Sequence, residues 1–217
     1  MNGAAISLLG TTAVQLVAAP PVCLETQQRI WAFSKEARRW RGVREVVPGM
    51  NNVTVLYDVL SIRPDVLQTK MEKAWEAAEG IVIEPSTLVV PVLYGGDFGP
   101  DLPAIAEHAG LSVEQVIEIH SNATYQVYFL GAHAGFAYLG GLDSRLHTPR
   151  LASPRLRVPA GSVAIGGAQA GVIAQDSPSG WLLLGRTSLK FFDIGKPEPA
   201  LLAPGDIVRF VPEEAPS

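Results

Sequence analysis

The sequence contains only one cysteine, Cys23, which excludes a disulfide within the chain and any metal cluster built on cysteines. A reducing, cytoplasmic location is therefore expected. The chain also has no large excess of positive or negative charge, since its formal net charge is −4 over 217 residues. This balance gives no field that would attract nucleic acid or an anionic membrane, so neither is expected as a partner.

Signals for export or membrane insertion are also missing from the N-terminal stretch MNGAAISLLGTTAVQLVAAPP. The stretch is mildly apolar, but it has no basic leader, and threonine and glutamine interrupt it before it reaches a membrane-spanning length. It is expected to form strands rather than a targeting signal.

Several catalytic signatures are absent. The glycine-rich stretch GSVAIGGAQAG lacks the lysine of a phosphate-binding P-loop, and the chain has no Gly-x-Ser-x-Gly elbow. No histidine pair or carboxylate–histidine cluster has the spacing of metal ligands, so no metal is expected. Any catalytic site must therefore be assembled from scattered polar residues or be shared with another chain.

The chain does contain enough apolar residues, 47%, for a globular fold with a buried core. Up to Gly80 the patterns follow the order of two strands, a helix, two strands and a helix. The helices are expected within residues 24–40 and 64–80, and Pro64 opens the second. An α+β lobe of ferredoxin-like type is the economical prediction, because each helix can cover one face of a single antiparallel sheet.

In the rest of the chain the pattern changes. Asp101 and Ser112 are expected to cap two short helices. After His120, short β-rich segments separated by glycine and proline indicate a closed or sandwich-like β domain. We therefore predict two domains, an α+β domain at residues 1–84 and a mainly β domain at residues 85–217.

A loop-like stretch at residues 132–155, AHAGFAYLGGLDSRLHTPRLASPR, combines a turn of glycines and aromatics with two Pro-Arg pairs. Arginine is the side chain best suited to grip a carboxylate or phosphate, and the proline before it stiffens the chain. Arg150, Arg155 and Arg186 are predicted to form an anion site at one mouth of the β domain. The alternative is that each is solvated or pairs with a carboxylate, the candidates being Asp143, Asp193 and Asp206.

Two further polar residues are candidates for a site. His120 ends the second short helix, where a cation is favoured and a pKa near neutrality would suit proton transfer. The alternative is an ordinary helix-end histidine. Gln169 lies between apolar segments, where it would orient a ligand or satisfy backbone groups. Trp181 is expected in the core rather than in a site.

Six stretches occur in order along the chain: LYGGDFGPDL, VIEIHSNATYQV, GFAYLGGL, TPRLASPRLRVPAGSVAIGGAQAGV, SPSGWLLLGRT and LLAPGDIVRF. With these and the N-terminal GTTAVQLV and VREVVPGMNNVTVLYD, the chain resembles the carboxyltransferase domain-containing family that includes the B subunit of 5-oxoprolinase, the sporulation kinase inhibitor KipI and allophanate hydrolase subunit 1. The resemblance runs over nearly the whole chain. It implies an N-terminal ferredoxin-like lobe followed by a mainly β, cyclophilin-like barrel.

The resemblance also implies a set of site residues. It gives catalytic roles to His120, Arg150 and Arg155, and substrate-binding roles to Gln169, Arg186, Gly135 and Phe136. Arg150 and Arg155 would bind the substrate carboxylate or a phosphoryl intermediate, while His120 would transfer protons. Gln169 would orient the amide. The chain departs from the family's usual motifs at Ala132, at Ala134, at residues 173–175 and at Ser179, where the family usually has glycine.

For activity, the resemblance implies the B subunit of an ATP-dependent 5-oxoprolinase, a hydrolase that converts 5-oxoproline to glutamate. The chain would be inactive alone and would act with a homologous C subunit and a further A subunit on a small-molecule acid. ATP would serve the complex, without a P-loop in this chain. Two alternatives stay open: allophanate hydrolase subunit 1 in urea degradation, and a KipI-like inhibitor of a sporulation-type histidine kinase.

Overall fold

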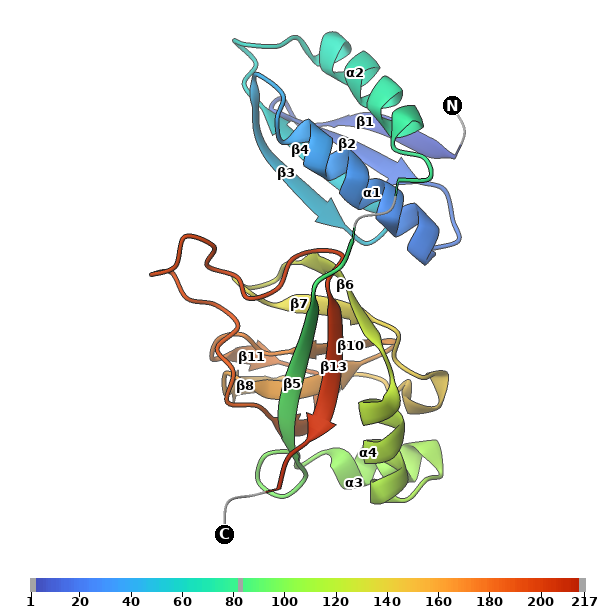
Figure 1. Ribbon diagram of the computed structural model, residues 1–217, viewed down its shortest axis with the longest axis vertical. Coiled ribbons are helices and arrows are strands. Elements are labelled where there is room, and N and C mark those ends of the chain that lie inside the picture. Colours follow the sequence, from blue (N-terminus) through green and yellow to red (C-terminus); the bar gives the residue numbers. More distant parts are fainter. Residues whose placement is uncertain (1–2, 82–83, 215–217) are drawn as a thin grey trace. The chain divides into compact units, whose positions relative to one another are not determined.

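The computed structural model describes residues 3–81 and 84–214 of the chain (Figure 1). The chain divides into two compact units, Met1–Glu84 and Pro85–Ser217. The first unit combines strands and helices in the order ββαββα, and the second is built mainly from strands. No helix in the described part of the chain is both long enough and apolar enough to cross a membrane.

The first unit is a four-stranded antiparallel sheet with two helices packed on it. Its elements are β1 (Ala4–Leu9), β2 (Ala13–Ala18), α1 (Leu24–Ala37), β3 (Val43–Gly49), β4 (Asn52–Tyr57) and α2 (Pro64–Ala77). Helix α1 packs on β3 and β4, and α2 packs on β1 and β2. Figure 1 shows the two helices lying across the same face of the sheet, and their buried side chains join those of the strands in one core cluster.

The periodicity that predicted this unit is confirmed in its core. Helix α1 turns Ile30 and Phe33 toward the sheet, and Leu16 and Val55 point back from β2 and β4. The sheet order is β1-β2-β4-β3, with every neighbouring pair antiparallel. A ferredoxin-like unit has the chain order βαββαβ. The α+β character is therefore as predicted, whereas the ferredoxin-like topology is not confirmed.

Seven strands within residues 84–214 form a closed barrel in the order β10-β7-β6-β13-β5-β12-β9. They are β5 (Thr87–Tyr94), β6 (Tyr125–Leu130), β7 (Ala137–Gly140), β9 (Ser162–Gly166), β10 (Gln169–Val172), β12 (Leu182–Arg186) and β13 (Ile207–Pro212). Strands β8 (Arg155–Val158) and β11 (Ser177–Ser179) pair separately. The prediction of a mainly β barrel is confirmed, and the loop-like stretch at residues 132–155 contains β7 and the first residue of β8.

Strand β13 lies between β5 and β6 in the barrel. It runs parallel to β5, from Ile207 opposite Thr87 to Pro212 opposite Val92, and antiparallel to β6. The remaining neighbouring pairs of the described barrel are antiparallel. The barrel is therefore closed by pairing between the first and the last of its strands along the chain.

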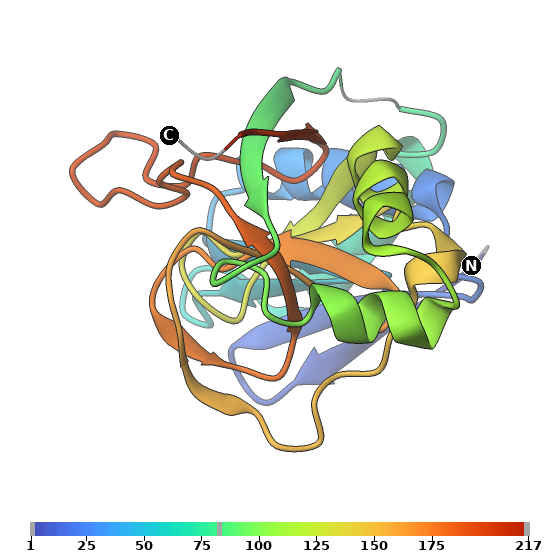
Figure 2. The same ribbon diagram turned by 90° about the horizontal axis from the view of Figure 1, so that it is seen from below.

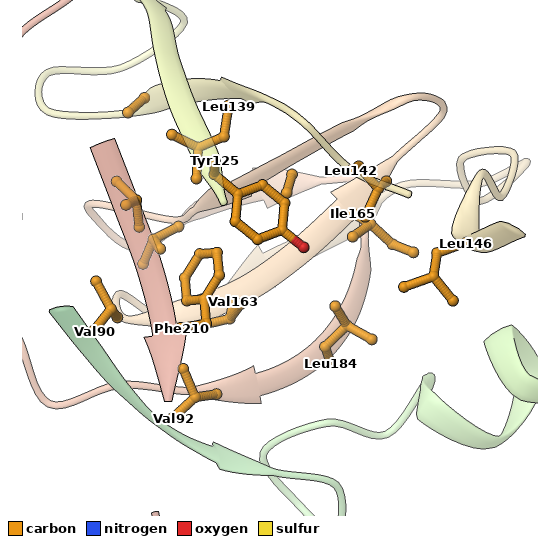
Figure 3. Close-up of a cluster of buried hydrophobic side chains, with 14 of the residues drawn as sticks. Val90, Val92, Tyr125, Leu139, Leu142, Leu146, Val163, Ile165, Leu184 and Phe210 are labelled. Atoms are coloured by element: carbon orange, nitrogen blue, oxygen red, sulfur yellow. The ribbon is translucent and has the colours of Figure 1, made fainter. Parts of the chain in front are cut away.

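Large apolar side chains fill the inside of the barrel (Figure 3). Tyr125 and Phe210 are surrounded by aliphatic residues from the other strands, including Val90, Val92, Leu139, Val163, Ile165 and Leu184. Inward-facing and outward-facing residues alternate along a strand, so the inward ones occur at every second position. Because these side chains pack the interior, a ligand site is to be sought at the rim or on the outside.

Two helices lie beside the barrel, as Figure 2 shows: α3 (Leu102–Ala109) against β12 and α4 (Val113–Asn122) against β13. A short 3₁₀ helix spans Ser144–Leu146. The predicted cap of α4 is confirmed, since the Ser112 hydroxyl accepts a hydrogen bond from the Gln115 N–H at 3.2 Å. Asp101 is the N-cap residue of α3 as predicted, but its carboxylate makes no capping hydrogen bond and binds other groups instead.

Candidate functional site

An aromatic cluster covers the outside of the barrel wall. The rings of Phe136 and Trp181 meet edge to face with their centroids 5.4 Å apart, and Tyr138 meets them at 4.8 and 5.9 Å. Strand β9 separates this cluster from the barrel core, because Val163 points inward whereas Ala164 belongs to the cluster. The cluster is thus a second apolar layer on the outer surface.

Arg150 lies on this cluster. Its guanidinium carbon is 5.3 Å from the centroid of the Trp181 ring, within the range of a cation–π contact, and the residue is exposed. The loop that carries it is held to the barrel unit, since the Leu151 N–H donates to the Gly180 carbonyl at 2.8 Å. The guanidinium is therefore presented to solvent from an anchored loop, an arrangement that suits the binding of an anion.

Ser179 links the cluster to the second Pro-Arg pair. Its hydroxyl accepts a hydrogen bond from the Trp181 N–H at 3.1 Å, and its backbone pairs with that of Arg155 in β8. The resemblance to the family leads one to expect glycine at this position. Serine supplies a contact at the turn before Trp181 that glycine cannot make.

Gly135 and Phe136 shape the cluster and the loop beside it. Gly135 has a φ of +79°, and a Cβ there would lie 2.7 Å from the Phe192 Cβ and 2.9 Å from the Phe191 carbonyl oxygen. Phe136 is buried among the aromatic rings. Gly135 and Phe136, which were predicted to bind substrate, thus make packing contacts within the barrel unit.

We expect Gly135→Ala to lower the free energy of unfolding by about 2–3 kcal/mol, because the left-handed backbone and the close approach to Phe192 both oppose a side chain. Chemical denaturation measures the loss. Gly110→Ala is the matched control, since Gly110 has a φ of +66° with nothing within 4 Å of an added Cβ. Its expected loss is about 1 kcal/mol. Equal losses for the two variants would contradict the close approach at Gly135.

Arg155 is tied to a carboxylate. Its Nη2 donates to Asp101 Oδ1 at 2.7 Å, and Asp101 Oδ2 accepts a hydrogen bond from the Leu183 N–H, also at 2.7 Å. The side chains of Asp101 and Arg155 are 11% and 32% exposed. The pair therefore joins β8, the start of α3 and β12, and the carboxylate partner of Arg155 is none of the three that the sequence suggested.

Gln169 opens β10 opposite Gly166 in the hairpin with β9, and it is half-buried. A Cβ on Gly166 would lie 2.8 Å from the Trp181 ring. Gln169 is therefore on the strand next to the aromatic cluster, at the end of the hairpin.

Arg186 lies apart from the other two predicted arginines. It ends β12, whereas Trp181 comes just before the first residue of that strand, and five residues of strand span about 16 Å. The Arg186 side chain is exposed and lines a cavity of its own. The contacts of Arg150 and Arg155 thus lie near the start of β12, whereas Arg186 lies at its end. The three arginines are therefore not gathered at one mouth of the barrel.

His120 is completely buried. Its Nδ1 lies 2.7 Å from the Tyr94 hydroxyl oxygen, and its ring stacks on Phe210 with the centroids 4.7 Å apart. Burial lowers the pKa of His120 from 6.5 to about 3, so the expected pKa near neutrality is wrong. Loss of hydration outweighs the favourable end of the helix dipole. The imidazole is therefore uncharged at neutral pH, and its Nε2 has no hydrogen-bond partner among the described residues.

Sequence reasoning missed the second role of two residues. Trp181, expected in the core, is buried but also holds Arg150 on its ring. Asp101, expected as a helix cap, holds Arg155. Both partnerships join residues far apart in the sequence, so local spacing gave no signal for them. The one hint was the position of Trp181 directly after the turn-forming SPSG.

Comparison with known proteins identifies close relatives. The family model described as carboxyltransferase domain, subdomain C and D, matches residues 4–202. The B subunit of 5-oxoprolinase from Escherichia coli O157:H7 is 49% identical over 215 residues, which cover 99% of this chain and 98% of that protein.

Solved structures show the same fold within longer chains. The crystal structure of TTHA0988 matches with a TM-score of 0.82 and 32% identity, over 94% of this chain but only 40% of that chain. The urea carboxylase of Kluyveromyces lactis matches with a TM-score of 0.78 and 20% identity, over 97% of this chain and 22% of that chain, which is a likeness of fold. The predicted resemblance is confirmed, and the chain belongs to the family of the carboxyltransferase domain, subdomain C and D.

Proposed function

We propose that this chain is the B subunit of a multi-subunit 5-oxoprolinase, which opens 5-oxoproline to glutamate at the expense of ATP. The observation that carries the proposal is the 49% identity to the Escherichia coli protein of that name over nearly the full length of both chains. A homologous C subunit and a further A subunit would complete the site. ATP would serve the assembled complex, and this chain has no P-loop with which to bind it.

The chemistry suits a subunit that recognises an acid. 5-Oxoproline carries a carboxylate and an unreactive lactam. Transfer of the γ-phosphoryl group of ATP to the lactam oxygen would release ADP and make the lactam carbon susceptible to attack by water. Addition of one water and cleavage of the C–N bond would then free the amine and leave the side-chain carboxyl as an acyl phosphate, and a second water would release glutamate and inorganic phosphate. Arg150 would hold carboxylate or phosphoryl oxygens, and Gln169 would orient the amide.

In this proposal His120 and Arg155 act through other residues. The uncharged His120 ring supports Tyr94 from inside the barrel unit, and Arg155 holds β8 to Asp101. Arg150 remains the predicted arginine whose guanidinium is exposed next to the aromatic cluster. The free thiol of Cys23 is in keeping with a reducing, cytoplasmic setting.

Co-purification of this chain with its homologous subunits, followed by assays of 5-oxoproline-dependent ATP hydrolysis and glutamate release, tests the proposal. We expect turnover that disappears when this chain is left out. A stable complex that hydrolyses a urea-derived acid but not 5-oxoproline would overturn the substrate assignment. Failure to form any complex would overturn the assignment to a multi-subunit enzyme and favour direct binding to a histidine kinase.

For the assembled enzyme, we expect Arg150→Ala to lower kcat/KM for 5-oxoproline by at least about 100-fold, because a charged group of the substrate would lose its forked partner. The unfolding midpoint should fall only slightly, since Arg150 is exposed and loses only its contact with the Trp181 ring. Arg209→Ala, at an exposed position of β13, is the control and should leave turnover unchanged. Normal turnover of the Arg150 variant would contradict the role.

A further inference from the structure

A cavity of about 430 Å³ lies at the end of β12 in the second unit. Its walls come from β5, from the turn between β8 and β9, and from the segment that follows Arg186. The volume falls in the usual range for pockets that hold small molecules. Phe98 and Leu189 contribute apolar surface, while Arg186 and Lys190 contribute positive charge.

The guanidinium of Arg186 is not committed to a carboxylate of the protein. Its Nε donates to the Ala160 carbonyl at 3.3 Å, and no acidic group within residues 84–214 lies within ion-pair distance of it. The Asp176 carboxylate, which binds Arg157 and the Ala160 N–H, interacts with Arg186 only over a longer distance. The arginines that line other cavities are different. Arg145 is bound by Asp143 at 2.7 Å, and Arg29 is bound by Glu79 at 3.5 Å. Arg186 therefore has both terminal nitrogens available for a ligand.

The other charged groups around this cavity are a lysine and carboxylates. Lys190 lies 3.2 Å from Asp193, which is not among the residues that line the cavity. Glu213 lines the cavity at the end of β13, and its backbone N–H donates to the Val92 carbonyl. Lys190 is thus paired, and Arg186 is the lining cation with no carboxylate at ion-pair distance among the described residues, so an anion is favoured next to its guanidinium.

The backbone beside Arg186 is held in a fixed shape. Gly161 has a φ of +85°, and an added Cβ would collide with the Thr187 carbonyl oxygen. The Thr187 N–H donates to the Gly161 carbonyl at 2.9 Å, and the Thr187 hydroxyl accepts a hydrogen bond from the Leu189 N–H at 3.3 Å. These contacts hold the backbone on both sides of Arg186, which lowers the entropy cost of binding a ligand there.

We propose that this cavity binds a small organic carboxylate. The two terminal nitrogens of Arg186 take the carboxylate as a fork, Lys190 adds positive charge, and the apolar part of the ligand lies against Phe98. The site goes beyond the proposed function, because it lies at the opposite end of β12 from Arg150 and does not depend on turnover. It gives the barrel unit a second place for an acid.

Amide-resolved NMR titration of the isotope-labelled full chain tests this site. The probes are 5-oxoproline, acetate and inorganic phosphate, each added to millimolar concentration. We expect saturable shifts for both carboxylates, centred on the amides of Gly161 and Thr187–Lys190, with tighter binding of 5-oxoproline because it has an apolar ring. Arg186→Ala should weaken binding at least about tenfold, and Arg186→Lys should restore it only in part.

Arg209→Ala is the matched control, because it removes an exposed barrel arginine that does not line the cavity. It should bind as the parent chain does. Shifts centred on Trp181 that persist in Arg186→Ala would overturn the proposal, as would binding of phosphate alone or no binding of any probe. Carboxylate binding at Arg186 together with a complex that does not turn over 5-oxoproline would uphold this site and remove the proposed function. Turnover of 5-oxoproline by the complex without carboxylate binding at Arg186 would uphold the proposed function and overturn this site.

Discussion

Lowering the pH from 7 to 5 is expected to reduce the free energy of unfolding by about 2 kcal/mol through His120 alone. The pKa of His120 is about 3 in the folded chain, against 6.5 for an exposed histidine. Below pH 6.5 the unfolded chain takes up a proton that the folded chain does not accept until about pH 3. The stabilisation is therefore complete above pH 6.5 and falls by about 1.4 kcal/mol per pH unit below it.

Urea denaturation at the two pH values, for the parent chain and for His120→Asn, measures this contribution. The asparagine amide replaces Nδ1 as partner of the Tyr94 hydroxyl but does not titrate. We expect the variant to be less stable at pH 7, since it loses the ring that stacks on Phe210, but to lose about 2 kcal/mol less on acidification. His108→Asn, at an exposed position of α3, is the control. Parallel pH curves for the parent chain and His120→Asn would contradict a neutral, buried imidazole.

Asp101→Ala is expected to lower the free energy of unfolding by about 2–4 kcal/mol. The substitution removes the partner of Arg155 Nη2 and leaves the buried N–H of Leu183 without its acceptor. The Nη1 of Arg155 is already buried without a partner among the described residues, so the remaining charge cannot easily find another. Chemical denaturation at neutral pH gives the value.

The exposed pair Asp143–Arg145 is the natural comparison, because its 2.7 Å separation equals that of Asp101–Arg155 while its side chains are 31% and 60% exposed. Asp143→Ala should cost no more than about 1 kcal/mol. A further variant, Asp101→Ala with Arg155→Ala, should recover part of the loss by removing the uncompensated charge. If the two single aspartate variants lose the same stability, the Asp101 pair is not the link between β8, α3 and β12 that its hydrogen bonds indicate.

The sequence predicted the first unit well because its signals are local. Ile30 and Phe33 lie on one side of α1, and the two hairpins join strands that are neighbours along the chain. The order of the sheet was beyond such reasoning, since the β2–β4 pairing brings together strands on either side of α1. In the second unit, β7 and β8 have four residues each and include or adjoin glycine and proline, so their sequence resembles a loop.

The candidate site was predictable as a set of residue types but not as an arrangement. Arginines after prolines indicated anion binding, and Arg150 is exposed as that role requires. Arg155 also follows a proline, yet its guanidinium forms an ion pair with the carboxylate of Asp101. His120 has the sequence of a helix-end cation, yet the barrel core encloses it. Burial and distant partners set the chemistry of these groups, and neither is visible in a short window of sequence.

The position of β13 between β5 and β6 has a consequence for synthesis of the protein. On the ribosome, β5 and β6 emerge long before β13. The hydrogen bond from the Ser86 N–H to the Asp206 carboxylate can form only after 120 further residues have been made. Until then two strand edges stand open, a state that is prone to aggregation. The first unit, made from neighbouring hairpins and helices, can fold as it emerges. The barrel is therefore expected to close only after its last strand has left the exit tunnel, and to be the part of the nascent chain that benefits most from a chaperone.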